Sequence, residues 1–425
     1  MDDKQQAADK VRAFYDAHPY PPPVEDLDSY RKRWQDESRR RAEYHLHWPN
    51  RPYREDLAVL VAGCGTSQAA RHALRQPASH VVGIDVGVTS VRHTEALKRK
   101  YDLTNLEVRQ LPIERVGELE RSFDKIVCTG VLHHLPDPDA GLRALREVLE
   151  PDGVMQLMVY AEYGRAGVYM LQEYARLLGV GDTDEEINDF ANTLMALPRE
   201  HPLARLLGES PDFRSKAGLA DELLHPQDRA YTVPELFEFI DQAGLIFGRW
   251  LRQAPYLPQC GDLANTPHSP RLAQLPEAEQ YAAVELFRGT MLRHSLVAYR
   301  DDTPDGEPGG GQPVRFGGDR WLDYVPLRLP GTISVREKLP PGAAAVLINQ
   351  AHTYPDLYLP VNTEEENLVE GIDGKRTIAE IVREAAATKG RQLHHEQVRT
   401  FFERLWWYDQ VVFDASEKIS SAASK

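Results

Sequence analysis

The sequence predicts an α/β fold built on a doubly wound, mostly parallel sheet of seven strands. Short apolar runs alternate with amphipathic segments of helical length, which is the pattern of a parallel sheet covered by helices on both faces. Two of the runs, "LAVLVAG" and "FDKIVCTGV", are apolar almost throughout, as expected for strands buried on both sides. A glycine-rich turn follows the first run, "LVAGCGTSQAARHAL", where the strand gives way to a helix.

The elements follow one another in a regular order. A helical stretch extends to about His47 and precedes the first strand. The expected strands and the helices between them are strand 57–63, helix 65–76, strand 80–86, helix 88–102, strand 106–110, strand 123–131, helix 140–153 and strand 154–161.

The alternation then stops, and residues 163–224 contain several helical segments that indicate an insertion packed over the sheet. A helix at 232–245 restores the pattern. Thr232 and Glu235 have the capping-box spacing, and Gly244 stands where a C-cap belongs. Segments 247–257 and 291–300 are the expected last strands, an antiparallel pair at the sheet edge.

Composition divides the chain further. Residues 301–320 are rich in Gly, Pro and acid and predict a flexible linker. We therefore expect an N-terminal helical lid at 1–50 and a large domain at 51–300. A small α+β domain at 321–415 and a disordered tail at 416–425 follow.

Bulk properties exclude several classes of protein. The 65 acidic and 50 basic side chains give a formal charge of -15, which disfavours nonspecific nucleic-acid binding. No apolar run approaches about 18 residues, so no membrane span is expected. The first residues lack the apolar core of a secretory signal. Three cysteines make no disulfide framework, which predicts a cytoplasmic protein.

The glycine turn suits a nucleotide-containing cofactor. Gly63 and Gly65 allow a ligand to approach the backbone closely. Asp85 ends the second strand, where a carboxylate can accept hydrogen bonds from both ribose hydroxyls. These features are compatible with NAD, but the dinucleotide-binding fingerprint has a third glycine at the position where this chain has Gln68. The turn therefore favours a cofactor without a pyrophosphate.

Four segments stand in the order and spacing of one family: "VAGCGT", "GIDVG", "FDKIVCTGVLHHLPDP" and "LREVLEPDGVMQLMV". From about residue 57 to 161 the chain resembles class I S-adenosylmethionine-dependent methyltransferases, and the rest of the sheet extends the likeness to about 300. The resemblance implies a Rossmann-like fold, S-adenosylmethionine as methyl donor and S-adenosylhomocysteine as product. Because the donor already carries a sulfonium leaving group, no metal is expected.

The resemblance also assigns cofactor contacts. Gly63, Gly65 and Thr66 would lie along the methionine moiety, Asp85 would bind the ribose and Val86 would pack on the adenine. The family usually has an acid after the third strand that accepts from the adenine amino group. This chain has Pro112 there, so either Glu114 or the backbone near Ile113 takes that role. The other expected cofactor-binding residues are Gln68 and Thr129.

Three groups of residues are candidates for the acceptor side. Tyr15 and Tyr20 either close the pocket or fasten the N-terminal segment. His133 and His134 follow the fourth strand, beside the transferred methyl group, where an imidazole serves as a catalytic base or has a structural role. A polar stretch contributes His225, Arg229 and Tyr231, which line the acceptor pocket or stabilise a turn.

The C-terminal segment resembles the small winged-helix modules of the PqqD-like type, chiefly through "IDGKRTIAEI". Helices lead there into a final strand pair, and Thr377 with Glu380 forms a second capping box. Three roles remain open for it: recognition of a peptide or carrier partner, dimerisation, or an accessory fold.

The sequence thus predicts a methyltransferase that acts on a small molecule or natural-product intermediate. One alternative is a peptide or protein methyltransferase that recognises its partner through the C-terminal domain, and another is a noncatalytic cofactor-binding regulator. A nicotinamide oxidoreductase is disfavoured by Gln68. A homodimer is an additional expectation.

Overall fold

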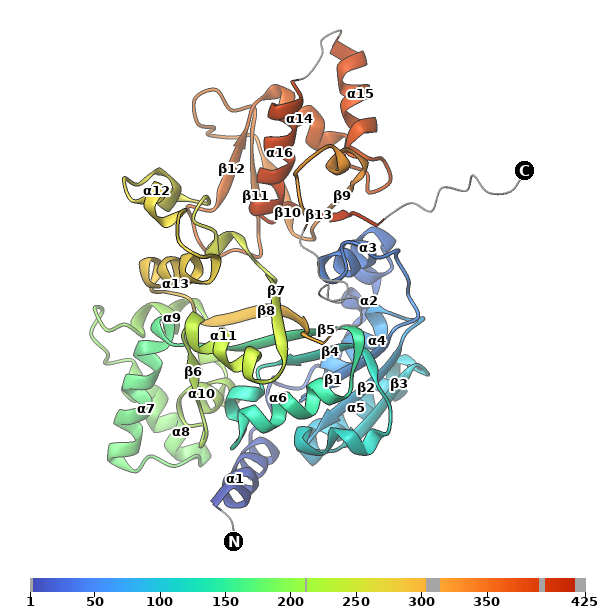
Figure 1. The fold of residues 1–425 in the computed structure, drawn as a ribbon. Coiled ribbons are helices and arrows are strands. Elements are labelled where there is room, and N and C mark those ends of the chain that lie inside the picture. The colour runs from blue at the N-terminus through green and yellow to red at the C-terminus, as the bar shows by residue number, and fades with distance from the viewer. Residues whose placement is uncertain (1–2, 211, 303–313, 390–393, 417–425) are drawn as a thin grey trace. The chain divides into compact units, whose positions relative to one another are not determined.

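A computed structural model describes residues 3–210, 212–302, 314–389 and 394–416 (Figure 1). The chain divides into two compact units, and it passes between them several times. The first unit comprises Met1–Arg33, Glu55–Ile246 and Glu285–Arg300, and the second comprises Trp34–Arg54, Phe247–Val284 and Asp301–Lys425.

The first unit is built around a mixed sheet of eight strands, whose order is β3-β2-β1-β4-β5-β8-β7 with β6 paired to β5. The pairs among β1 to β5 are parallel, and β8 runs antiparallel to β5. The strands are β1 (Ala58–Ala62), β2 (His80–Asp85), β3 (Leu106–Gln110), β4 (Phe123–Thr129), β5 (Leu149–Ala161), β6 (Ala230–Tyr231), β7 (Leu245–Trp250) and β8 (Arg293–Arg300).

The expected doubly wound α/β sheet is confirmed, and its central strands are as apolar as predicted. Val59 and Leu60 of β1 and Ile126 of β4 are fully buried, because helices cover the sheet on both faces. Two details differ from the prediction. The fifth strand begins at Leu149, where a register shift opposite Phe123 accommodates additional residues. The sheet also has an eighth strand, the two-residue β6, whereas the last two strands, β8 and β7, are neighbours at its edge as predicted.

The helices of the first unit include the predicted insertion, whose members gather at one end of the sheet (Figure 1). Their apolar faces form a core of their own, in which Leu171, Phe190 and Leu223 are buried together with Phe14 of α1. The helices are α1 (Asp3–Ala17), α2 (Asp28–Trp34), α4 (Gln68–Arg75), α5 (Val88–Tyr101), α6 (Pro138–Glu147), α7 (Ala166–Leu178), α8 (Asp184–Leu194), α9 (Ala204–Glu209), α10 (Lys216–Leu223) and α11 (Val233–Gln242).

Predicted helix ends agree with the structure where a local hydrogen bond decides them. The Thr232 hydroxyl accepts from the Glu235 amide, and the Glu235 carboxylate accepts from the Thr232 amide in return. Gly244 follows α11 with a φ of 73°. The capping box and the C-cap glycine are therefore both confirmed.

The second unit is α+β. Its strands form a three-stranded sheet, β10-β11-β12, and a two-stranded sheet, β13-β9. The elements of this part of the chain are α3 (Glu37–His47), α12 (Ser269–Leu272), α13 (Glu277–Arg288), β9 (Val325–Arg328), β10 (Thr332–Val335), β11 (Ala345–Asn349), β12 (Tyr358–Val361), α14 (Thr363–Glu370), α15 (Ile378–Lys389), α16 (His395–Trp407) and β13 (Val411–Asp414). The final strand pairs with β9 rather than with an adjacent strand. The predicted capping box at Thr377 and Glu380 is present.

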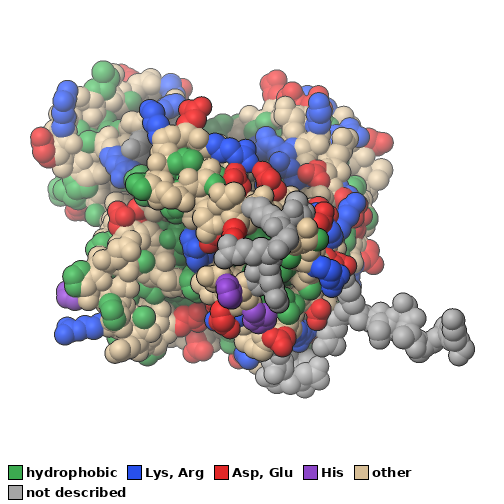
Figure 2. Space-filling model, turned by 90° about the horizontal axis from the view of Figure 1, so that it is seen from above, with side chains coloured by type: hydrophobic (Ala, Val, Ile, Leu, Met, Phe, Trp, Pro, Cys, Tyr) green, Lys and Arg blue, Asp and Glu red, His purple; other side chains and the backbone are tan. Residues whose placement is uncertain are grey.

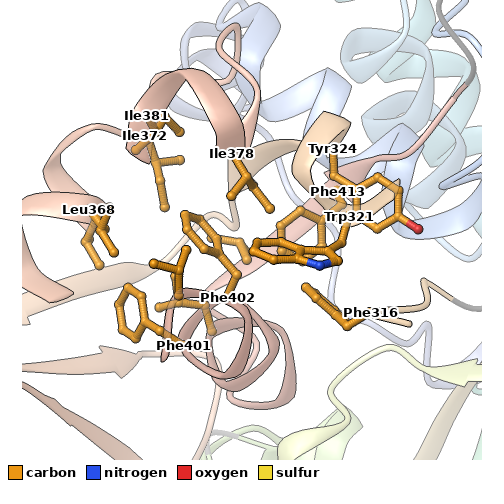
Figure 3. Close-up of a cluster of buried hydrophobic side chains, with 14 of the residues drawn as sticks. Phe316, Trp321, Tyr324, Leu368, Ile372, Ile378, Ile381, Phe401, Phe402 and Phe413 are labelled. Carbon is orange, nitrogen blue, oxygen red and sulfur yellow. The ribbon is translucent and has the colours of Figure 1, made fainter. Parts of the chain in front are cut away.

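An aromatic core holds this unit together (Figure 3). Trp321, Phe402 and Phe413 are fully buried in it. Val314 and Phe316 belong to the same core, so the prediction that 301–320 is a linker is wrong at its C-terminal end, where apolar side chains stand between glycines. Positions 303–313 of that linker and positions 417–425 of the predicted tail lie outside the described residues.

The predicted domain limits also differ from the compact units in two places. Residues 34–50 of the expected N-terminal lid belong to the second unit, and so does the segment 247–284. In the second unit Ala254 and Cys260 are buried in one cluster with Leu357. These are contacts between segments far apart in sequence, which composition does not report.

A buried carboxylate joins two of these segments. Asp409, with a φ of 51°, accepts from the Ala254 amide at 3.0 Å and lies 3.3 Å from Arg249 and 3.4 Å from His352. Burial raises the pKa of Asp409 to about 7, against the opposing influence of Arg249.

The face in Figure 2 mixes basic and acidic side chains. Among residues 3–210, 212–302, 314–389 and 394–416, no helix is both long and apolar enough to cross a bilayer.

Candidate active site

The turn after β1 is held against the end of β2 by one carboxylate. The Gly65 amide donates to Oδ2 of Asp85 at 2.8 Å, and the Gly87 amide donates to Oδ1 at 2.8 Å. Burial raises the pKa of Asp85, while these two hydrogen bonds act in the opposite direction. The side chain is thus fixed at the carboxyl edge of the sheet, where open α/β sheets bind their ligands.

Both glycines of the turn are required by their surroundings. Gly63 and Gly65 have φ values of 67° and 52°. A Cβ on Gly63 would lie 2.3 Å from the Val131 side chain, and one on Gly65 would lie 3.2 Å from Pro21. The turn therefore has no room for side chains, because Val131 and Pro21 lie against it.

The N-terminal segment lies over this turn. The Thr66 hydroxyl donates to the Pro21 carbonyl at 2.8 Å, and the Tyr20 carbonyl lies near Gly65. Asp16 at the end of α1 accepts from the Thr89 amide of α5 at 3.3 Å. These contacts fasten the N-terminal segment to the glycine turn and to the start of α5.

The other predicted cofactor residues lie around the same edge. The Val86 carbonyl accepts from the Gln110 side chain at 3.1 Å, and Ile113 is buried while Glu114 is exposed. The Thr129 hydroxyl donates to the Gln68 side chain at 3.1 Å. All of them follow strand ends or begin helices at one edge of the sheet.

A buried polar cluster lies beyond this edge. His134, Asp221 and His225 each offer one atom, and these three atoms lie within 4.8 Å of one another. All three side chains are buried. Burial lowers the pKa of both histidines and raises the pKa of Asp221 to about 8, with Glu222 as the second cause of that rise.

The backbone of one residue, Gln227, orients both imidazoles. The Gln227 amide donates to Nδ1 of His225 at 3.0 Å, and the Gln227 carbonyl lies 2.8 Å from Nδ1 of His134. Because a carbonyl only accepts, Nδ1 of His134 carries the proton and its Nε2 has a free lone pair. Because an amide only donates, Nδ1 of His225 is unprotonated and the ring carries its proton on Nε2.

Tyr15 connects the cluster with the cofactor edge. Its hydroxyl donates to Asp221 at 3.1 Å, and its ring packs against His225 with centroids 5.3 Å apart. Burial raises the pKa of Tyr15 most, and the negative charge of Asp221 raises it further. Asp85, the carboxylate at the candidate cofactor edge, also raises the pKa of Tyr15, by a smaller amount.

A buried arginine, Arg165, lies next to this cluster with two acidic partners. Arg165 donates to Glu222 at 2.7 Å, lies 3.4 Å from Asp228 and covers the Tyr160 ring at 3.5 Å. Burial acts to lower the pKa of Arg165, but Glu222 and its neighbours more than offset that effect. Glu222 and Asp228 thus share one buried cation.

His133 packs on Tyr160, the ring that Arg165 also covers. Its ring stacks on Tyr160 with centroids 3.9 Å apart, and neither ring nitrogen has a hydrogen-bond partner among the described residues. Burial, then His134, lowers its pKa well below the ordinary value. Both predicted histidines are therefore held neutral, but only His134 lies in the cluster with Asp221.

The remaining predicted residues lie apart. The Arg229 amide donates to the His133 carbonyl at 3.1 Å, but the exposed Arg229 guanidinium covers the ring of Tyr231 at 4.6 Å. Tyr231 is fully buried with its ring 5.1 Å from Phe239. Neither side chain makes a hydrogen bond, ion pair or ring contact with the cluster among the described residues.

Sequence reasoning missed Asp221, Glu222 and Arg165 as site residues. The available signal was the spacing of Asp221 and His225, four positions apart across the end of α10. Both lie in the polar stretch 221–233, in which the prediction singled out His225 but not Asp221 or Glu222.

Comparisons with known proteins agree with this geometry. The family model "Methyltransferase domain" matches residues 60–155. An uncharacterized protein of Synechococcus sp. is 31% identical over 304 residues, which cover 69% of this chain and 72% of the relative. A ubiquinone biosynthesis O-methyltransferase of Neisseria meningitidis is 32% identical over 98 residues, 23% of this chain and 41% of that protein.

The chain therefore contains a methyltransferase domain, which includes residues 60–155. The structure of PKMT2 from Rickettsia typhi has the same fold, with a TM-score of 0.65 at 17% identity, over 93% of this methyltransferase and 76% of that chain. The same protein in complex with AdoHcy gives a TM-score of 0.63 at 16% identity, over 93% and 77% of the two chains.

The methyl donor of this methyltransferase is S-adenosylmethionine, which supplies an electrophilic methyl group on a sulfonium. The residues at the sheet edge fit such a ligand. Asp85 presents a fixed carboxylate at the end of β2, and the turn at Gly63 and Gly65 excludes side chains.

Proposed function

We propose that this methyltransferase methylates a small-molecule acceptor that enters the cluster of His134, Asp221 and His225, with His134 as the base. The single observation that carries the proposal is the hydrogen bond from the Tyr15 hydroxyl to Asp221 at 3.1 Å. It ties the cluster to the same N-terminal segment that covers the glycine turn. A buried cluster of this kind admits a small or slender molecule rather than a folded surface.

The cofactor side of the proposal assigns each predicted residue. Asp85 accepts hydrogen bonds from the ribose hydroxyls, and Val86 packs on the adenine. The backbone near Ile113 lies beside the adenine, because the Glu114 side chain is exposed. Gly63, Gly65 and Thr66 follow the methionine moiety. Gln68 and Thr129 lie at the same edge, bonded to each other. Methyl transfer then depends chiefly on alignment of the acceptor, with His134 removing its proton.

The test is transfer of label from S-adenosylmethionine carrying a radioactive methyl group to an extract of the source cells. The proposal expects label among small solutes, and expects His134→Gln to lower the rate by about 100-fold while the donor still binds. His80→Gln, a change of an exposed histidine, is the matched control. Label confined to protein, or equal rates for both variants, would contradict the proposal.

A second candidate is a peptide or protein acceptor. The observation in its favour is a groove in the second unit lined by Arg328, Thr332, Ser334, Ile372 and Leu405, beside strand β10, where Ile333 is exposed. The likeness of 321–415 to PqqD-like winged-helix modules remains a prediction that would give this groove a partner. Label found in protein would favour this candidate.

A further inference from the structure

Helix α7 has apolar side chains on two sides. Val168, Leu171 and Ala175 are buried in the core of the helical insertion. A second set of apolar side chains faces outward and forms what we call the outer stripe, and its members with their exposed fractions are Tyr163 41%, Met170 52%, Tyr174 40%, Leu177 77% and Leu178 63%. A surface helix of a globular protein normally has one apolar face, and a helix that is apolar all round is buried. The outer stripe is therefore a face that the described part of the chain leaves uncovered.

The members of the outer stripe share one side of the helix. Met170, Tyr174 and Leu177 are four and three positions apart, which places them one above the other on an α-helix. Tyr163 precedes Met170 by about two turns. The Tyr174 ring stacks on Phe190 with centroids 6.3 Å apart and 14° between the ring planes, so its orientation is set within the insertion. In Figure 1, α7 lies at the outer side of the insertion, with α10 on the side of the sheet.

The outer stripe is large enough to form half of an interface. Side chains of this size have about 150–250 Å² of surface each, so the exposed fractions leave about 500 Å² of apolar surface on one copy of the chain. Two such faces would together bury about 1,000 Å², which is where specific protein interfaces begin. Apolar side chains scattered singly over a surface need no explanation, whereas a contiguous stripe of this size marks a contact site.

The charges beside the stripe indicate which partner covers it. Glu173 and Arg176 form an ion pair along one border, and both side chains are exposed. Tyr174 lies midway between Met170 and Leu178, so a half-turn of α7 about an axis through Tyr174, perpendicular to the helix, maps the stripe onto itself. The same half-turn brings Glu173 of one copy toward Arg176 of the other. The surface is thus complementary to itself, which is the requirement of a two-fold interface.

A membrane surface fits the stripe less well. Helices that lie on a bilayer carry several Lys and Arg side chains on the polar face, which attract anionic lipids. Arg176 is the one basic residue in the sequence of α7, and Glu173 beside it neutralises its charge. The border of the stripe therefore suits a partner that offers both signs of charge.

We propose that two copies of this chain associate through the outer stripe, with α7 of one copy antiparallel to α7 of the other and Tyr174 near the two-fold axis. Met170 of each copy then packs near Leu178 of the other. Leu177, the most exposed member of the stripe, becomes buried in the contact. The association is independent of which acceptor the methyltransferase uses.

Sedimentation of the full-length protein over a range of concentrations tests the association. We expect a species of twice the chain mass of 48.1 kDa. Leu177→Glu places a charge in the middle of the stripe and should raise the dissociation constant of the dimer by about 100-fold or more. The matched control is Leu286→Glu, since Leu286 in α13 is 61% exposed and lies outside the stripe. Circular dichroism shows whether both variants keep the fold.

Three results would overturn the proposal. The first is an unmodified protein that stays monomeric at the highest attainable concentration. The second is an equal effect of Leu177→Glu and Leu286→Glu on the dimer. The third is flotation of the unmodified protein, but not of Leu177→Glu, with vesicles of phosphatidylcholine and phosphatidylserine, which would assign the stripe to a membrane.

Charge reversal tests the antiparallel arrangement. Glu173→Arg alone and Arg176→Glu alone each place like charges opposite one another across the two-fold axis, so each variant should dimerise about three- to tenfold more weakly. In an equal mixture of the two variants, every changed charge meets an opposite charge on the other copy, and mixed dimers should recover the affinity of the unmodified protein. Sedimentation with one variant carrying a fluorescent label measures the mixed dimer. Mixed dimers no tighter than those of either variant alone would overturn the proposed arrangement, because charge pairing within one helix cannot depend on mixing.

Discussion

The amide of Gly65 and the carboxylate of Asp85 meet at 2.8 Å, so the turn after β1 and the end of β2 form one rigid corner. The second carboxylate oxygen accepts from Gly87, which begins the turn into α5. The protein itself therefore holds the Asp85 carboxylate in place at this corner before any ligand binds.

Asp85→Asn should weaken binding of the methyl donor. The amide nitrogen of Asn would face one of two backbone N–H donors, and the charge that accepts from ribose hydroxyls would be lost. A hydrogen bond to a charged group contributes about 1.5–3 kcal/mol, so we expect Kd to rise by about 10- to 100-fold. Calorimetric titration with S-adenosylmethionine measures this Kd.

The control for Asp85→Asn is Asp102→Asn. Asp102 also lies in the first unit, at the end of α5 with a φ of 51°, a conformation that Asn tolerates. Its donor affinity should equal that of the unmodified protein. Unchanged affinity in Asp85→Asn as well would remove the ribose assignment.

Gly63→Ala should destabilise the first unit. The new Cβ would lie 2.3 Å from Val131, at a φ of 67°. Left-handed backbone costs about 1–2 kcal/mol and overpacking about 1–3 kcal/mol. Gly208→Ala is the control, because nothing lies within 4 Å of its Cβ position in α9. Denaturant unfolding with equal midpoints for the two variants would contradict this expectation.

Activity should be retained from neutral pH into mildly acid solution and then be lost. Burial lowers the pKa of His134 below its usual 6.5, so the folded protein keeps this base uncharged at neutral pH. As pH falls through the lowered pKa, the ring gains a proton and cannot accept another. A pH profile of kcat/KM measures the acid limb, and a limb centred above pH 6.5 would argue against His134 as the base.

Tyr15→Phe should loosen α1. The variant keeps the ring packing on His225 and removes only the hydroxyl that donates to Asp221. Loss of such a bond costs about 0.5–2 kcal/mol. Hydrogen exchange of the α1 amides should become several-fold faster, whereas Tyr163→Phe, a change of an exposed ring, should leave it unaltered. Equal exchange in both variants would show that the hydroxyl does not hold α1.

Asp409→Asn should flatten the pH dependence of stability of the second unit. The folded pKa of Asp409 is raised to about 7 from 3.8, so between these values the folded protein holds a proton that the unfolded chain has released. The free energy of unfolding therefore falls as pH rises from about 4 to 7. Asn tolerates the φ of 51° and still accepts from Ala254.

Unfolding curves at several pH values measure the slope for Asp409→Asn. Asp356→Asn in the same unit is a useful companion, because its carboxylate accepts from the Asp262 amide in an exposed position. We expect the slope to change only for Asp409. A slope equal to that of the unmodified protein would show that Asp409 ionises normally.

The cofactor edge could be predicted because local sequence determines it. The turn at Gly63 and Gly65 and the acid at Asp85 lie at strand ends that the apolar runs mark, and parallel strands bring those ends together. The capping box at Thr232 and Glu235 was likewise predicted from four residues and is present.

The buried cluster of His134, Asp221 and His225 could be predicted only in part. His134 and His225 were named, but the acid between them was not, because Asp221 on a helix has the appearance of a solvated residue until its burial is known. Arg165 was missed for the same reason. Val314 and Phe316 were assigned to a linker, since the average composition around them outweighed two apolar side chains.

The second unit is assembled from three separate stretches of chain, and this limits how it can be exchanged or removed. A cut at residue 300 would take Leu357 and Trp407 away from Ala254 and Cys260, which would then be left as an uncovered half of a core. Grafting this unit onto another enzyme would require 34–54 and 247–284 to be transplanted as well. The second unit therefore cannot be removed or exchanged by a single cut of the chain.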